Sequence, residues 1–249
     1  MTEKKICFQV SNQKIVGILV KPEKKTKNAV LLLHGFKGTK DEWGRFKKLA
    51  EALSREGFAN LRIDMRGSGE SEGRFRDMSV YTEKEDALVA VNYLIKQGYE
   101  RIGLVGLSFG GLVSLLTSLE IEISVMCLWA PATYYRAEKH LRGKENELEE
   151  KGYIIVFSRV SGEPFEVGKK FFETLNEINT DEVLEKIKCP TLIIHGNEDE
   201  SVPIEGSKKA IKLMNCKKEL KIIPNADHNF YEQIDEFINL TVEWFKKYL

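Results

Sequence analysis

Residues 104–111 read LVGLSFGG and join an apolar strand to an apolar helix through one serine. A turn this abrupt needs glycine two positions before and two positions after Ser108, because a side chain there would collide with the neighbouring strand or with the helix backbone. The hydroxyl of Ser108 then projects beyond the edge of the sheet. This is where a nucleophile would lie.

Strands and helices alternate on both sides of this turn. Apolar runs of strand length recur, and most are separated by segments with helical periodicity. This alternation predicts an α/β fold with a mostly parallel, doubly wound sheet. The expected strands cover residues 29–33, 58–63, 101–105, 123–129, 191–195 and 220–223, and the expected helices cover 45–56, 82–97, 109–119, 204–214 and 232–248.

Two segments depart from this alternation. A short polar turn joins residues 5–10 to residues 14–20, which predicts an N-terminal antiparallel hairpin at the sheet edge. Between residues 131 and 188 the rhythm breaks over too long a stretch for an ordinary connection, so we expect a small inserted cap over the strand ends. The chain then divides into an α/β core, residues 1–131 and 187–249, and a cap, residues 132–186. The cap is expected to hold a charged lead-in at 138–151, a strand at 152–156 and a helix at 168–178.

Composition argues against several kinds of partner and group. The 249 residues carry 38 basic and 38 acidic side chains, which favours neither nucleic acid nor an anionic membrane. Scattered cysteines and the absence of ligand residues at metal spacing predict no disulfide framework, no metal and no cofactor. The N-terminus is charged where a secretory signal is apolar, and no apolar run approaches the roughly 18 residues of a membrane span. We expect a cytoplasmic protein that acts on a small molecule.

A serine nucleophile needs a base, and four histidines compete for that role. His34 and His195 each precede a glycine at the end of a strand, a position that more often shapes a loop. His140 lies in the charged lead-in of the cap. His228 follows the last expected strand, in the kind of loop where open α/β sheets place their chemistry. We therefore expect His228 to be the general base.

The acid that orients the histidine is expected in the turn after the penultimate strand, where Glu198, Asp199 and Glu200 follow one another. Asp199 is favoured because a short carboxylate is easier to hold rigidly against an imidazole. The dipeptide Val202-Pro203 can also anchor the turn before the next helix begins. Glu198 or Glu200 could take the role if the turn is rotated.

Acyl transfer also needs hydrogen-bond donors aimed at the developing oxyanion. The backbone amide of Phe109, directly after the serine, is one expected donor. The other is expected from the loop after strand 29–33, where Phe36 stands in a glycine-bearing turn. These two amides are the predicted oxyanion hole.

Taken together, these segments resemble the α/β-hydrolases, and in particular the small intracellular carboxylesterases that include feruloyl and cinnamoyl esterases. The likeness spans nearly the whole chain and is weakest in the cap. It implies a catalytic triad of Ser108, Asp199 and His228 in the family's order, with Phe36 and Phe109 as oxyanion donors. It is carried by HGF at 34–36, DMRGSGES at 64–71, GLSFGG at 106–111, HGNED at 195–199 and DH at 227–228.

The expected function is hydrolysis of carboxylic esters with small acyl or aryl-acyl groups, through an acyl-enzyme. The cap is rich in aromatic residues that could line an apolar pocket, and Tyr134, Tyr153 and Phe172 are singled out as substrate contacts. Further cap aromatics are Tyr135, Phe157, Phe165 and Phe171.

Other interpretations stay open at this stage. A peptidase of the prolyl-oligopeptidase type, a thioesterase or a monoacylglycerol lipase would use the same acyl-enzyme chemistry. A catalytically silent binding protein could share the fold. The glycines of residues 67–73 suggest a phosphate-binding loop, but the irregular sequence after Gly73 predicts no helix N-terminus to hold a phosphate. The sequence leaves the oligomeric state open, with a homodimer among the options.

Overall fold

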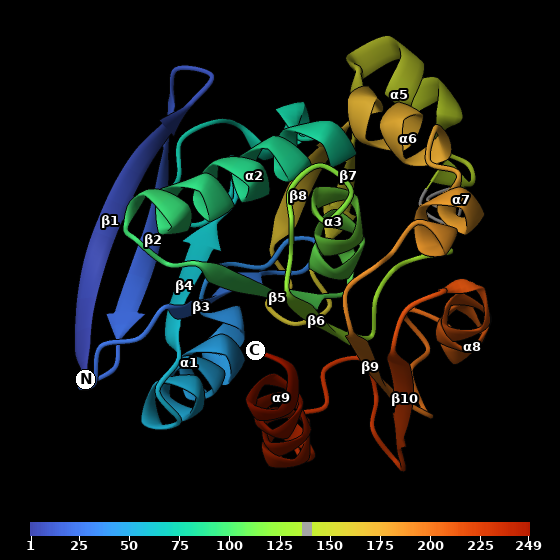
Figure 1. Ribbon diagram of the computed structural model, residues 1–249. Helices are drawn as coiled ribbons and strands as arrows, with labels where there is room; N and C mark the ends of the chain where they lie inside the picture. The colour runs from blue at the N-terminus through green and yellow to red at the C-terminus, as the bar shows by residue number, and fades with distance from the viewer. Residues whose placement is uncertain (136–140) are drawn as a thin grey trace.

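A mostly parallel, eight-stranded sheet forms the centre of the computed structural model, which describes residues 1–135 and 141–249 (Figure 1). All neighbouring strands pair in parallel except β1–β2 and β2–β4, so the predicted edge hairpin is confirmed. Across the sheet the strands are β1 (Thr2–Val10), β2 (Gln13–Lys21), β4 (Ala59–Asp64), β3 (Asn28–Leu33), β5 (Arg101–Leu107), β6 (Val125–Trp129), β9 (Thr191–Gly196) and β10 (Lys218–Ile223).

Helices cover both faces of this sheet. On one face lie α1 (Arg45–Arg55) and α9 (Ile234–Tyr248), and on the other lie α2 (Val80–Lys96), α3 (Phe109–Thr117) and α8 (Ile204–Leu213) (Figure 1). The central strand β3 is apolar on both faces. Val30 and Leu32 pack in the core beneath α1 and α9, whereas Leu31 and Leu33 pack in the core on the opposite face of the sheet. A strand buried on both faces has a continuous apolar sequence, as residues 29–33 do.

The order of the strands reverses at β3. The chain places β4 on one side of β3 and β5 on its other side. At such a switch point the loops after the two strands diverge and leave a crevice at the carboxyl ends of the sheet. The loop after β3 carries Phe36, and Ser108 directly follows β5.

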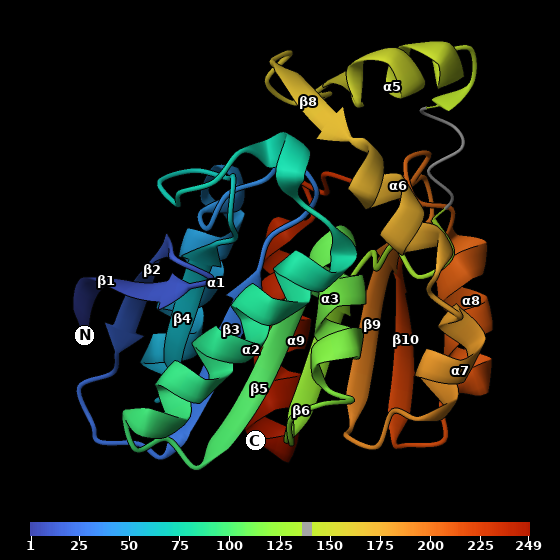
Figure 2. The same ribbon diagram turned by 90° about the horizontal axis from the view of Figure 1, so that it is seen from above.

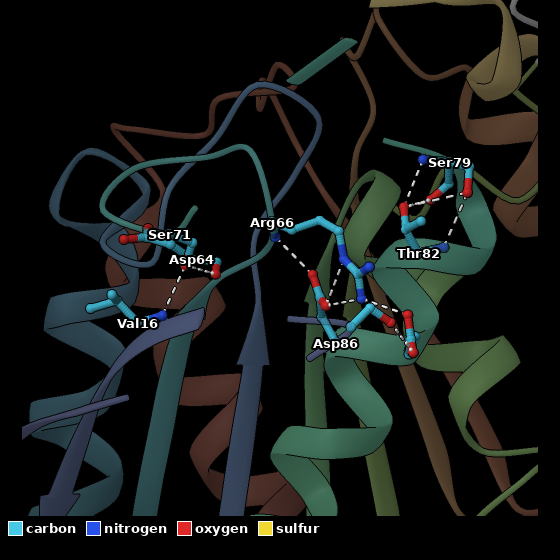
Figure 3. Close-up of polar contacts among 9 residues, drawn as sticks. Val16, Asp64, Arg66, Ser71, Ser79, Thr82 and Asp86 are labelled. Atoms are coloured by element: carbon cyan, nitrogen blue, oxygen red, sulfur yellow. Dashed lines mark hydrogen bonds and ion pairs between the residues drawn. The ribbon is translucent and has the colours of Figure 1, made fainter. Parts of the chain in front are cut away.

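Hydrogen bonds to the end of β4 and to helix α2 hold the glycine-rich loop that follows β4 (Figure 3). The Ser71 hydroxyl donates to the Asp64 carbonyl, and Arg66 donates to the Asp86 carboxylate of α2 from both its backbone amide, at 2.7 Å, and its guanidinium, at 2.9 Å. The Glu70 amide donates to the Asp64 carboxylate at 3.0 Å. A loop whose amide already faces a protein carboxylate does not suit a phosphate, so its contacts favour a role in bracing β4 against α2.

Helix α2 begins two residues earlier than the sequence pattern predicts. The Ser79 side chain accepts a hydrogen bond from the Thr82 amide at 3.1 Å, and the Thr82 hydroxyl accepts one from the Ser79 amide at 2.8 Å (Figure 3). This reciprocal cap satisfies amides that the first turn of a helix leaves without partners. None of the helices in the described ranges has the length and apolar character that crossing a bilayer requires.

Residues 132–186, called the inserted segment below, connect β6 to β9 and add a separate two-stranded antiparallel sheet. Figure 2 shows α5, β8 and α6 beyond one end of the central strands. The predicted strand and helix correspond to β7 and α6, whereas α5, β8 and α7 were not predicted. Residues 138–140 of the predicted lead-in lie outside the described residues. The elements are α5 (Glu145–Lys151), β7 (Tyr153–Phe157), β8 (Pro164–Gly168), α6 (Lys169–Asn176) and α7 (Thr180–Glu185).

Candidate active site

Ser108 occupies a strained turn between β5 and α3. Its φ of 53° and ψ of −114° lie where non-glycine residues are rare, at a cost of about 1–3 kcal/mol that functional sites commonly tolerate. The glycines around it are required by space. A Cβ atom built on Gly106 would come within 3.0 Å of the Gly110 backbone, and one built on Gly110 would come as close to the Leu33 backbone. A Cβ atom on Gly111 would come within 3.0 Å of Pro131. The turn therefore holds the serine at the carboxyl end of the sheet.

Ser108, His228 and Asp199 lie in one chain of hydrogen bonds. His228 Nε2 is 3.1 Å from the Ser108 hydroxyl oxygen, and His228 Nδ1 is 2.6 Å from Asp199 Oδ2. An ionised carboxylate can only accept, so Nδ1 carries the proton and, in a neutral imidazole, Nε2 is left as an acceptor. The arrangement can therefore take a proton from the serine hydroxyl.

Asp199 is buried and its carboxylate is fully hydrogen-bonded. Oδ1 accepts from the amides of Ser201 and Val202, each at 2.8 Å, and Oδ2 accepts from His195 as well as from His228. Burial acts to raise the pKa of Asp199, but the hydrogen bonds from His195 and His228 outweigh it and hold that pKa below its ordinary value. The neighbours Glu198 and Glu200, left open by the sequence, are both exposed.

The other histidines contact the protein rather than the pocket. His195 is buried and lies 2.9 Å from the Val202 carbonyl, 3.1 Å from Asp199 and 2.8 Å from the Ser207 hydroxyl. It therefore helps fix the acid loop, a role that sequence reasoning did not assign beyond loop shaping. His34 accepts from the Met65 amide at 3.0 Å. His140 lies outside the described residues.

The amides of Phe36 and Phe109 are available for an oxyanion. Within residues 1–135 and 141–249, neither amide has a hydrogen-bond acceptor. The amides of Gly35 and Gly38, on either side of Phe36, are already committed, the first to the Glu42 carboxylate at 2.6 Å and the second to the Gly35 carbonyl at 2.9 Å. Of these three positions in the loop, only Phe36 has an amide left to donate.

A buried ion pair links the oxyanion loop to the histidine loop, and sequence reasoning missed it. Glu42 accepts from the Gly35 amide with one carboxylate oxygen and from Arg45 with the other, at 2.7 Å. Arg45 also donates to the carbonyl of Asn229, next to His228, at 2.8 Å. The only sequence signal was an oppositely charged pair three residues apart at a helix start, which is common on exposed surfaces.

We expect Arg45→Met to destabilise the protein by about 3–5 kcal/mol, because it leaves the Glu42 carboxylate buried without its counter-charge. The measurement is urea denaturation followed by circular dichroism. The double variant Arg45→Met/Glu42→Gln is expected to recover part of the loss, since glutamine still offers an oxygen to the Gly35 amide. A loss below about 1 kcal/mol for the single variant, as for an exposed pair, would show that the link is dispensable.

A pocket of about 330 Å³ opens directly onto this constellation. Its lining includes Ser108, His228, Phe36 and Phe109, which follow the carboxyl ends of β3, β5 and β10. The inserted segment also contributes to the lining, through Tyr135, Phe157, Ser158, Arg159, Phe171 and Leu175. Nowhere in the described part of the chain do three or more His, Cys, Asp or Glu side chains gather as metal ligands would.

The three aromatic residues singled out from the sequence lie outside the lining of this pocket. The Tyr134 hydroxyl donates to Asp181 at 2.6 Å, Tyr153 lies under the guanidinium of Arg76, and Phe172 is buried in the core. Adjacent side chains on a helix or in an extended chain point in different directions, and the neighbours of two of these residues, Tyr135 and Phe171, line the pocket instead. Phe171 does so from α6, stacked on Phe36 with ring centroids 4.7 Å apart.

The model of the prolyl oligopeptidase family matches residues 45–249. The chain belongs to this family. Family and fold together make it a serine hydrolase of the α/β-hydrolase superfamily.

Individual relatives are more distant. The chain is 27% identical to the human serine hydrolase BPHL, covering 87% of this chain and 79% of BPHL, and 24% identical to a monoglyceride lipase homolog of monkeypox virus, covering 92% and 91%. Among solved structures it resembles the ferulic-acid complex of Est1E from Butyrivibrio proteoclasticus, with a TM-score of 0.81, 22% identity and 98% of each chain covered. The α/β-hydrolase GrgF from Penicillium sp. sh18 gives a TM-score of 0.85 at 18% identity, over 100% of this chain and 99% of GrgF.

Proposed function

We propose that the protein hydrolyses carboxylic esters of small acyl or aryl-acyl groups through an acyl-enzyme on Ser108. The observation that carries the proposal is the hydrogen-bonded chain from Ser108 through His228 to the buried Asp199, beside a pocket of about 330 Å³. A pocket of that size, with aromatic walls, suits a small acyl group. The even balance of charge over the chain favours a small molecule over nucleic acid or a membrane surface.

The proposed reaction follows from the roles of these groups. As Ser108 Oγ attacks the ester carbonyl, its proton passes to His228 Nε2, and Asp199 stabilises the imidazolium that forms. The carbonyl oxygen becomes an oxyanion within reach of the amides of Phe36 and Phe109. His228 then gives the proton to the departing alcohol. A water molecule, deprotonated by the same histidine, releases the acid and restores Ser108.

The comparisons support an ester substrate without fixing it. Est1E was crystallised with ferulic acid, an aryl acid, and one curated relative is a monoglyceride lipase homolog. The family model instead carries the name of a peptidase. Peptidases and esterases share the acyl-enzyme mechanism, so the leaving group has to be determined by experiment.

The test of the proposed function is turnover of matched substrates by the purified protein. We expect 4-nitrophenyl butyrate to be hydrolysed well above the buffer rate, and the 4-nitroanilide of the same acid to be hydrolysed far more slowly. Preference for the anilide would establish a peptidase instead. Turnover of neither compound, nor of other short esters, would leave a binding protein as the better account.

Within this function, we expect Phe171→Leu to change acyl selectivity. Phe171 lines the pocket and packs against both Phe36 and Phe109, so its loss reshapes the acyl wall. The ratio of kcat/KM for aryl-acyl esters to that for acetate esters should shift by about tenfold. Phe172→Leu is the matched control, because Phe172 is equally buried on the same helix but lies outside the lining. An equal shift in both variants would mean that α6 acts only through general packing.

A further inference from the structure

The pocket lining carries more positive charge than its own carboxylate neutralises. Three cationic side chains line the pocket, Lys37, Arg45 and Arg159, and the lining contains one carboxylate, Glu42. Glu42 and Arg45 form a buried ion pair at 2.7 Å and so neutralise each other. Lys37 and Arg159 are left without an anion among the lining residues.

Both remaining cations are held by neutral oxygens. Lys37 Nζ donates to the Phe157 carbonyl at 2.9 Å, and Arg159 Nη1 donates to the Ser201 hydroxyl at 2.9 Å. No carboxylate in the described ranges forms an ion pair with either of them. An ammonium has three donors and a guanidinium five, so each keeps donors that a ligand can use.

The two cations also affect each other electrostatically. Burial, together with the positive charge of Arg159, lowers the pKa of Lys37 to about 8. Lys37 therefore still carries its charge at neutral pH, at an electrostatic cost that an anion between the two would relieve.

Lys37 and the partner of Arg159 both lie close in sequence to residues of the proposed catalytic site. Lys37 follows Phe36, whose amide is a proposed oxyanion donor, and Ser201, the partner of Arg159, lies two residues after Asp199. We propose that Lys37 and Arg159 form a subsite for a carboxylate carried by the substrate, so that the preferred esters are anionic. This inference rests on the proposed function and specifies its substrate class. A planar carboxylate matches the fork of the arginine as well as the lysine ammonium.

The experiment compares pairs of esters in which methylation of one carboxyl group removes one negative charge. One pair is the 4-methylumbelliferyl half-ester of hexanedioic acid and the same compound with its distal carboxyl methylated, which places the charge on the acyl side. A second pair, the butyrate esters of 3-hydroxybenzoic acid and of its methyl ester, places the charge on the leaving group. For the wild type we expect the anionic member of one pair to have a kcat/KM at least about tenfold higher, a typical effect of a charge-assisted hydrogen bond.

Variants then assign the preference to the two cations. In Lys37→Met/Arg159→Gln the ratio of anionic to neutral kcat/KM should fall to near one. The control Lys48→Met/Arg55→Gln removes the same net charge from exposed positions and should keep the wild-type ratio. Because each ratio is taken on one protein preparation, partial unfolding of a variant cancels.

Two outcomes would overturn the subsite: a wild-type ratio at or below one in both pairs, or equal loss on both members of a pair in the double variant. The second outcome would mean that the two cations only fasten the inserted segment to the core. If the wild type hydrolyses no ester of either pair, the proposed function fails separately. In that case, titration calorimetry with Ser108→Ala measures whether the charged member of each pair binds more tightly than the neutral one. Adding Lys37→Met/Arg159→Gln to this variant shows whether the difference depends on the two cations.

Discussion

Replacing Ser108 with alanine is expected to lower kcat for ester hydrolysis by about 10⁶-fold, equivalent to about 8 kcal/mol of transition-state stabilisation. The physical reason is that the Ser108 hydroxyl is the group that His228 Nε2 contacts at the end of the chain formed with Asp199, and alanine has no oxygen to attack the acyl group. The measurement is kcat/KM for a chromogenic butyrate ester, with wild type and variant purified in parallel.

The matched control is Ser118→Ala, at the other end of α3, whose hydroxyl bonds only to the Leu115 carbonyl of its own helix. Its activity should equal that of the wild type. Thermal unfolding of Ser108→Ala should show no loss of stability, since the turn is fixed by glycines and backbone contacts. Residual activity of more than a few per cent in Ser108→Ala would exclude this serine as the nucleophile.

A second large effect is expected for Asp199→Asn, about 10⁴-fold in kcat. An asparagine can turn its amide nitrogen toward His228, which then holds the proton on Nε2 and can no longer accept one from Ser108. The controls are Glu198→Gln and Glu200→Gln, the exposed neighbours in the same turn. Both should stay within about twofold of the wild type, since exposed side chains of this kind change a protein little. A greater loss in either control than in Asp199→Asn would move the acid to that residue.

The loss of folding stability in Asp199→Asn is also expected to depend on pH. The pKa of Asp199 in the folded protein lies below its unfolded value of about 3.9, so its ionised form stabilises the fold above that pH. The contribution is lost progressively as the pH falls from this unfolded value to the lower, folded one. The free-energy difference of unfolding between wild type and Asp199→Asn should therefore be constant from about pH 7 to about pH 5 and shrink below about pH 4. A difference that already shrinks near neutral pH would point to another titrating group.

Much of the core could be predicted because each signal is local. Residues 29–33 are apolar throughout, and such a run is typical of a strand buried on both faces, as β3 is. The glycines around Ser108 are required by contacts within a few residues of the turn or with the neighbouring strand. The order of the elements was then enough to bring His228 and Asp199 to the same edge of the sheet as Ser108.

The walls of the pocket could not be predicted in the same way. Phe171 and Phe172 are identical in chemistry and adjacent in sequence, and only the packing of α6 decides that the first faces the pocket. The strand β8 begins with a proline and carries a charge, so its sequence has no clear strand pattern. The link through Arg45 joins residues 184 positions apart, which no local pattern reveals.

The central claim is that one serine, Ser108, is activated for attack on an acyl group, and covalent labelling tests it most directly. A fluorophosphonate probe reacts with serines that a neighbouring base activates. After incubation of the native protein, digestion and mass spectrometry should locate the adduct on the peptide containing Ser108 and on no other serine, and His228→Ala should abolish the labelling. Labelling of a different serine, or none under conditions in which the protein hydrolyses esters, would contradict the account.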